Sequence, residues 1–241
     1  GGFVYTTLDP DSLNEIITLV NNFYQNELEY YQSDPNYDIQ VNEFDKIEDF
    51  DSATGFWIGL QNDLGNYKLG TNYETFSEEV DGNFYVTDLN TGNYLKVNDS
   101  LEIEVEGIYI DREKPINEYF SMSAGIGYYK GELSVKERSQ NKINGTFYQY
   151  KISGKTDLEE DFGFKVGVST DYPLSDNLSL LGNLNYRKLE LDIEDSSESI
   201  NFDGVELKAG LTYKFWLIYN TKNHNQGGKN GKVSFLSLQT G

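Results

Sequence analysis

The chain has no cysteine, a single histidine and only four prolines among its 241 residues. The absence of cysteine excludes disulfide scaffolds, thiol nucleophiles and cysteine-based metal sites. The single histidine, His224, belongs to no recognisable Ser-His-Asp set, and the paired acids of so acidic a chain arise readily by chance. We therefore expect neither enzymatic activity nor a cofactor.

Long hydrophobic runs are also missing. The mean hydropathy is -0.59 and hydrophobic residues make up 37% of the chain. A helix that crosses a membrane needs about 20 apolar residues in succession, so spanning by helices is excluded. Spanning by strands is not excluded, because each strand of a transmembrane barrel carries only a weak hydrophobic signal.

Basic residues are scarce. The chain has 19 Lys and Arg against 40 Asp and Glu, a formal net charge of -21. Nucleic acid requires clustered basic residues, so we expect no nucleic-acid partner. The acidic cluster of Asp45, Glu48, Asp49 and Asp51 lacks the ligand spacing and the glycine of a calcium loop. Its simplest interpretation is a solvated loop, with no metal site.

The pattern that is present is strand-like alternation. In Phe162–Tyr172 the apolar side chains recur at every second position, against small or charged residues. Val205–Phe215 repeats this pattern and ends on an aromatic residue. Such alternation fits a sheet with one face on a soluble core, and equally a barrel with one face on lipid.

Eight segments carry this pattern, and the connections between them alternate in length. The short connections are Asp63–Asn66, Asp111–Glu118 and Pro173–Asn177. The expected strands are Gly1–Leu8, Thr54–Gln61, Tyr67–Phe76, Leu101–Tyr109, Phe120–Tyr128, Phe162–Tyr172, Leu178–Ile193 and Val205–Phe215. We therefore predict an all-β, eight-stranded antiparallel up-and-down barrel.

The first long connection carries one predicted amphipathic helix, over about residues 10–24. Asp9 is a suitable N-cap and Pro10 suits the first helical position. Leu13, Ile16, Ile17 and Val20 then form one apolar stripe, which we expect to pack against the rest of the fold.

An even strand number, short turns at one end and long loops at the other make the chain resemble the small outer-membrane β-barrels of the OmpA/OmpX-like, porin-type superfamily. The resemblance covers about residues 1–215. It implies a bacterial outer-membrane protein, structural or porin-like, that contacts outer-membrane lipid. It also implies that Phe215 is the terminal aromatic read by the barrel-assembly machinery.

The resemblance further implies a monomer whose acidic extracellular loops bind cations or an extracellular partner. In such a barrel the polar face of each strand lines the interior, where charges of both signs should pair. Eight strands leave an interior that side chains can fill, which favours a closed barrel over an ion path. The predicted interior network is Lys68, Glu74, Glu102, Glu104, Glu106, Lys165, Arg187, Glu206 and Lys208.

Both ends of the chain differ from this pattern. The first strand is short, so we expect a few residues to be missing before Gly1. Residues 216–241 contain no Asp or Glu, and we expect them to form a peripheral C-terminal tail whose deletion leaves the barrel stable. The alternative fold is a soluble lipocalin-like barrel that binds a small apolar ligand, which Gly55-Phe56-Trp57 superficially matches.

Overall fold

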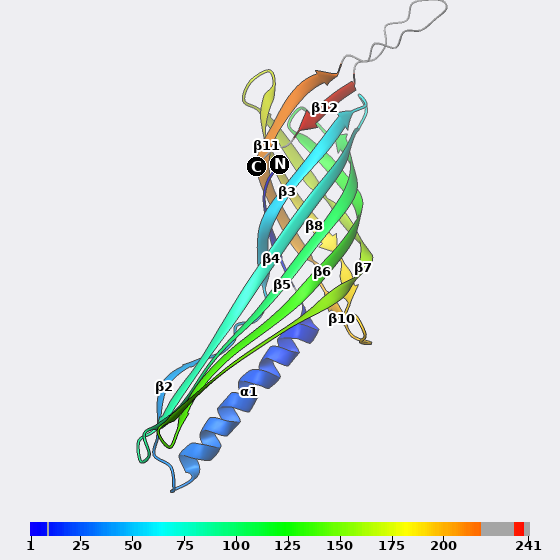
Figure 1. Cartoon of the computed structure of the whole chain (residues 1–241). Coiled ribbons are helices and arrows are strands. Elements are labelled where there is room, and N and C mark those ends of the chain that lie inside the picture. The colour runs from blue at the N-terminus through cyan, green and yellow to red at the C-terminus, as the bar shows by residue number, and fades with distance from the viewer. Residues whose placement is uncertain (9, 218–233, 239–241) are drawn as a thin grey trace, which may run out of the picture.

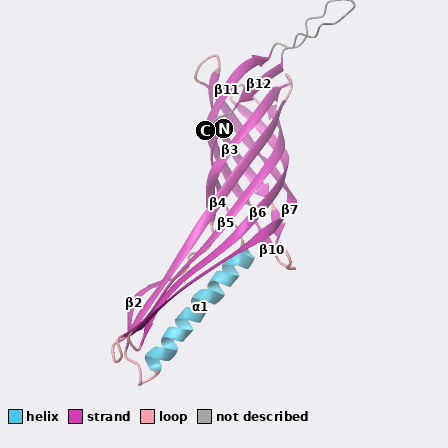
Figure 2. Ribbon diagram, in the orientation of Figure 1, coloured by secondary structure: helices cyan, strands magenta, loops and turns pink. Residues whose placement is uncertain are grey.

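The computed structural model describes residues 1–8, 10–217 and 234–238. Its secondary structure is almost entirely strand, with the single helix α1 over Asp11–Ser33 among these residues (Figure 2). The strands are β1 (Gly2–Thr7), β2 (Ile39–Asp45), β3 (Ser52–Asp63), β4 (Lys68–Asp88), β5 (Asn93–Pro115), β6 (Phe120–Ile143), β7 (Thr146–Pro173), β8 (Leu178–Lys188), β9 (Glu190–Asp192), β10 (Ser199–Asn201), β11 (Gly204–Leu217) and β12 (Ser234–Leu238).

Eight of these strands close into a ring. The order is β1-β3-β4-β5-β6-β7-β8-β11, and β11 pairs back onto β1. Every pairing is antiparallel, and Gly2 of β1 faces Gly210 on one side and Trp57 on the other. The prediction of an all-β fold built on eight antiparallel strands is confirmed.

The three short turns lie at one end of the ring, where the sequence predicted them. Leu64 N–H donates to the Tyr67 carbonyl at 2.9 Å, and Leu174 N–H donates to the Leu178 carbonyl at 2.8 Å. Gly65 has a φ of +87°, which a glycine adopts without a steric cost. These turns fix the register of the hairpins that form the ring.

The other end of the ring continues into a long projection (Figure 1). The segments that the sequence analysis treated as loops are strands: β4 and β5 stay paired to Asp88 and Asn93, and β6 and β7 stay paired to Ile143 and Thr146. We call the part of these hairpins over residues 78–103 and 133–157 the extension. Strand β2 pairs with β4 along one edge of the extension.

Helix α1 lies along the extension and ends nine residues later than predicted. Asn14 and Asn21 hold it to the following segment, because their side-chain amides bond the backbone of Phe50 and Ile47 in both directions. The predicted cap Asp9 lies outside the described residues, and Pro10 occupies the N-cap position without a side-chain bond. Within the described residues, no helix has the length and hydrophobicity needed to cross a membrane.

The described part of the C-terminal segment pairs with the ring. β12 joins β11 from Tyr213 to Leu217 and joins β3 from Leu60 to Asn62. It fills the place above the short strand β1, where both neighbouring edges would otherwise lack a partner. This pairing differs from the expected peripheral tail, while the boundary at residue 215 stays a prediction and His224 lies outside the described residues.

The apolar core lies where the ring meets α1. Leu13 and Ile17 of the helix are buried there together with side chains from the lower ends of the ring strands and from β9 and β10. These strand and loop residues include Phe50, Phe76, Ile103, Leu158, Leu189, Leu191, Ile200 and Phe202, each at most 2% exposed. The core therefore closes the interior of the ring on the side of the extension.

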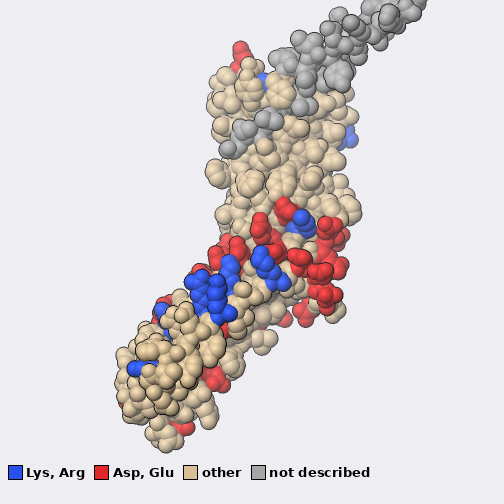
Figure 3. Space-filling view, viewed as in Figure 1, with Lys and Arg blue, Asp and Glu red and all other residues tan. Residues whose placement is uncertain are grey.

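Above this core the ring has apolar side chains on its outer surface. They include Phe3, Phe56, Ile108, Met122, Phe164, Val166, Leu184 and Leu207, all between 47% and 78% exposed. In Figure 3 the wall of the ring is almost free of charged atoms, whereas acidic and basic atoms gather where the extension begins.

Candidate functional site

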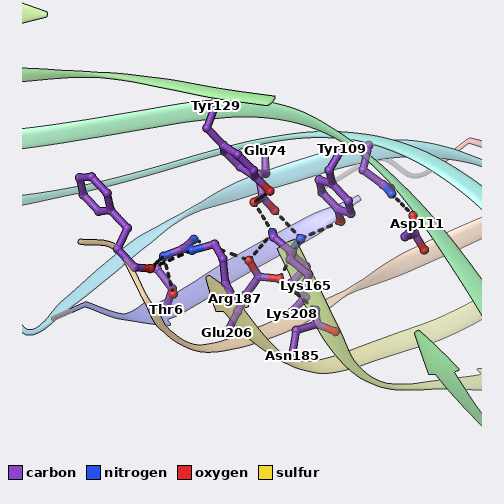
Figure 4. A network of polar contacts seen from close by, with 12 residues as sticks. Thr6, Glu74, Tyr109, Asp111, Tyr129, Lys165, Asn185, Arg187, Glu206 and Lys208 are labelled. Atoms are coloured by element: carbon purple, nitrogen blue, oxygen red, sulfur yellow. Dashed lines mark hydrogen bonds and ion pairs between the residues drawn. The ribbon is translucent and has the colours of Figure 1, made fainter. Parts of the chain in front are cut away.

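Two buried carboxylates face two buried ammonium groups inside the ring (Figure 4). Glu74 of β4 and Glu206 of β11 are fully buried, and each pairs with both Lys165 of β7 and Lys208 of β11. Lys165 Nζ lies 2.6 Å from Glu206 Oε2, and Lys208 Nζ lies 3.1 Å from Glu206 Oε1. Strands from opposite sides of the ring are thereby joined through its interior.

Arg187 of β8 extends this network toward the apolar core. Its guanidinium donates to the Phe202 carbonyl from two nitrogens, each at 3.1 Å, and to the Thr6 hydroxyl at 3.1 Å. Its Nη1 atom is 3.8 Å from Glu206 Oε2. The guanidinium also lies over the Phe76 ring, 4.2 Å from the centroid, a distance typical of a cation–π contact.

Aromatic residues surround the ammonium groups. Lys208 donates to the Tyr109 hydroxyl at 2.7 Å, and the Tyr129 hydroxyl donates to Glu74 at 3.0 Å. The Tyr129 ring fits only because Gly107 and Gly127 lie beneath it: a Cβ at either position would come within 2.5 Å of the ring. These glycines explain part of the small-residue pattern on the inner face of the strands.

The network leaves little space inside the ring. A cavity of about 20 Å³ beside Trp57, Asn72 and Tyr109 is large enough for about one water molecule. The five charged side chains at the centre comprise two acids and three bases, so most of the charge is neutralised locally. This arrangement braces the ring across its diameter and obstructs passage through it.

The structure brings five of the nine predicted interior residues into this one network: Glu74, Lys165, Arg187, Glu206 and Lys208. Lys68 lies apart from it, half-buried near the short-turn end, with its Nζ atom 3.3 Å from Asp171 Oδ2.

The prediction that Glu102, Glu104 and Glu106 face the interior is wrong. Leu101, Ile103 and Val105 are the inward residues of this stretch, each 9% exposed or less. The glutamates lie on the outer surface, where Glu106 pairs with Lys130 at 2.9 Å and Glu102 pairs with Lys136 at 3.0 Å.

The error has a physical cause in strand β5. Its outer face carries Ile108 and Ile110 on one side of Gly107, and Glu106 and Glu104 on the other. The same face therefore changes from apolar to acidic along a single strand, because the strand passes from the apolar wall of the ring into the extension. The prediction assumed that apolar residues face outward along the whole strand. This assumption is correct for Ile108 and Ile110, but it assigns the wrong face to the residues before Gly107.

Several members of the network were missed from the sequence. Tyr109, Tyr129 and Trp57 are aromatic residues that point inward, and Asn185 donates to Glu206 at 3.0 Å. The inward orientation of Tyr109 could have been predicted from the sequence. Tyr109 alternates with the outward-facing Ile108 and Ile110 and shares its face with Asp111.

A larger cavity, of about 900 Å³, opens at the rim of the ring between β5, β6 and β7. Carboxylates line most of it, and Lys130 and Lys155 contribute the basic groups. Lys130 pairs with Glu106, and Lys155 pairs with Glu132. Among the described residues, no group of three or more His, Asp or Glu side chains is arranged to hold a metal ion.

Comparison with known proteins gives only distant similarities. No protein-family model matches the chain. Over 185 residues, 72% of the chain, it is 23% identical to the LPS-assembly protein LptD of Psychrobacter cryohalolentis, and the match spans 17% of that relative's length. The crystal structure of Neisserial surface protein A (NspA) aligns with 64% of this chain and 94% of that one, at 12% identity and a TM-score of 0.26. Both similarities are too weak to assign the chain to a family.

Proposed function

We propose that the chain is an outer-membrane β-barrel protein with a closed interior, which holds its extension outside the cell. One observation carries this proposal: the ring is apolar outside and ionic inside. Lipid accepts the exposed aromatic and aliphatic side chains of the wall, and a closed ring leaves no unpaired strand edge in the hydrocarbon.

The soluble, lipocalin-like alternative requires the opposite arrangement. A ligand-binding barrel in water turns apolar side chains inward around a cavity. Here the interior positions are held by Glu74, Lys165 and Lys208, and the space beside Trp57 is about 20 Å³. Water would meet a continuous apolar wall, which soluble monomers rarely expose.

The closed interior favours a role in structure or display over a porin-like role. Buried ion pairs cross the ring, and the apolar core lies between them and the extension. To pass through the ring, a solute would have to break these ion pairs and displace the apolar core. Acidic residues of β5, β6 and β7 line the rim cavity, where they present a negatively charged surface to the surroundings.

The orientation follows from the two ends of the ring. In outer-membrane barrels the short turns face the periplasm and the long connections face outward. The three short turns therefore lie in the periplasm, and the extension projects from the cell. Outer-membrane lipid and the barrel-assembly machinery are the partners that this placement requires, with Phe215 of β11 as the proposed recognition residue, in a monomeric barrel.

Membrane insertion and closure are tested separately. The protein should partition into detergent or lipid vesicles and should migrate differently on electrophoresis before and after boiling. In planar bilayers it should give no stable large conductance. A monomer that stays soluble without detergent would refute the membrane assignment, whereas stable large channels would refute only the closed interior.

A further inference from the structure

Near the tip of the extension, the outer face is basic, although the chain as a whole is acidic. Residues 133–156 contain five basic residues and one acidic residue, in a chain with 40 acids and 19 bases overall. The one acid, Glu137, pairs in register with Asp99 of β5, on the opposite face of the sheet from its neighbours Lys136 and Arg138. The outer face of this hairpin therefore has basic residues without an acid among them.

Near the ring, the cations of this face have carboxylate partners. Lys136 lies 3.0 Å from Glu102 and 3.8 Å from Glu79, and Lys155 pairs with Glu132. Burial is slight at these positions, and the pairs are ordinary surface ion pairs.

Farther out, this pairing ends. Four cations share the outer face there, and we call them the basic cluster: Lys96 of β5, Arg138 and Lys142 of β6, and Lys151 of β7. None of the four has a carboxylate partner among the described residues. The nearest acids on this face are Asp81 of β4, which lies opposite Ser100 and nearer the ring, and Glu43 and Asp45 of β2 at the far edge of the sheet.

Two members of the cluster repel each other directly. Arg138 and Lys151 are opposite residues of the antiparallel pair β6–β7. Like charges in this position destabilise a sheet. Lys96 faces Gln140 and so lies diagonally from Arg138. An anion placed between these side chains would remove the repulsion, and the planar guanidinium of Arg138 suits a carboxylate or sulfate group.

The side chains between the cations indicate the rest of the ligand. Asn98 faces Arg138, and Gln140 faces Gln149, so amide groups that both donate and accept hydrogen bonds separate the charges. At the outer end, Tyr94 and Phe147 flank Lys142, and Phe147 is 68% exposed. Anionic groups, hydroxyl groups and apolar ring faces in alternation are the features of an acidic polysaccharide.

We propose that the basic cluster binds an acidic polysaccharide, with carboxylate or sulfate groups, from the surroundings of the cell. The cluster lies 10 to 14 residues beyond the last apolar residues of the wall, which is roughly 30–45 Å along the strands. The phosphates of the lipid that surrounds the ring are out of reach at that distance. The net charge of -21 disfavours the denser charge of nucleic acid. The inference rests on the proposed function only for the outward direction of the extension.

The test uses the purified, folded full-length protein in detergent and measures binding of heparin, alginate and neutral dextran. We expect heparin and alginate to bind, to weaken as salt is raised, and dextran not to bind. The double variant R138Q/K151Q should lower heparin affinity about tenfold or more, because two charge-assisted contacts are lost. It should fold normally, since it removes a repulsion.

A matched variant and a competing ligand make the result decisive. K130Q/K188Q removes the same net charge outside the cluster, and it should change heparin affinity less than about twofold. Equal losses in both double variants, or binding of dextran as strong as that of heparin, would overturn the proposal. Tighter binding of single-stranded DNA than of either glycan would overturn its ligand class. Each of these results is independent of whether the ring enters a membrane.

Discussion

Replacing Glu74 with Gln should destabilise the ring more than replacing Lys208 with Met. In the network, two carboxylates, Glu74 and Glu206, form ion pairs with the three bases Lys165, Arg187 and Lys208. The variant E74Q leaves one carboxylate for three bases. Removing one partner of a buried pair typically costs about 3–5 kcal/mol of folding free energy, because the remaining charge is buried without compensation.

The variant K208M gives the contrasting case. Two carboxylates then face two bases, and methionine keeps much of the lysine side-chain volume. The change removes the ion pairs of Lys208 with Glu74 and Glu206, although both carboxylates keep Lys165, and it removes the hydrogen bond to the Tyr109 hydroxyl, 2.7 Å long in the wild type. We expect a cost of about 1–3 kcal/mol for leaving this buried group without its partner. The double variant E74Q/K208M should cost less than the sum of the two single changes, because the residues are in contact.

The measurement is guanidinium unfolding of the refolded protein in detergent, followed by tryptophan fluorescence and by the shift on electrophoresis after boiling. K188M, at an exposed lysine on the same strand as Arg187, is the control and should leave the unfolding midpoint unchanged. The reasoning is refuted if K208M proves more destabilising than E74Q, or if the double variant shows simple additivity.

Three further predictions concern the wall, the extension and the end of the chain. In lipid vesicles, V166R places a charge in the middle of the apolar face of β7 and should lower folding stability by about 2–4 kcal/mol, whereas S100R on the extension should fold as the wild type does. Burial raises the pKa of Asp99 above its ordinary value of 3.8, although the hydrogen bond donated by the Tyr24 hydroxyl acts in the other direction. The folded state therefore holds the proton of Asp99 more tightly than the unfolded state does. The attachment of α1 should be most stable at acid pH and should weaken as the pH rises from about 4 through the raised pKa. Hydrogen exchange of the α1 amides should show this pH dependence in the wild type and should lose it in the variant D99N. Deleting residues 218–241 removes β12 and leaves the edges at Leu60–Asn62 and Tyr213–Leu217 unpaired, so the unfolding midpoint should fall; an unchanged midpoint would restore the expectation of a peripheral tail.

The amino-acid sequence by itself determined the eight strand segments of the ring, their antiparallel order and the short turns, but not the strands of the extension. Period-two alternation is a local property, and segments such as Phe162–Tyr172 and Val205–Phe215 show it without interruption. Glu74, Lys165, Glu206 and Lys208 were recognised as interior residues for the same reason: each lies opposite the apolar side chains of its own strand.

Only the tertiary structure decided where that rule stops. On β5 the outer face changes from isoleucine to glutamate at Gly107, because one half of the strand lies in the wall of the ring and the other half lies in the extension, where α1 and the core cover the inner face. Alternation reports that two faces differ, but it does not report what covers each of them. The partners of a face come from residues far away in the sequence, as Tyr24 and Asp99 or Arg138 and Lys151 do. For that reason only the three-dimensional structure shows which residues of the network pair with one another and which cations form the basic cluster.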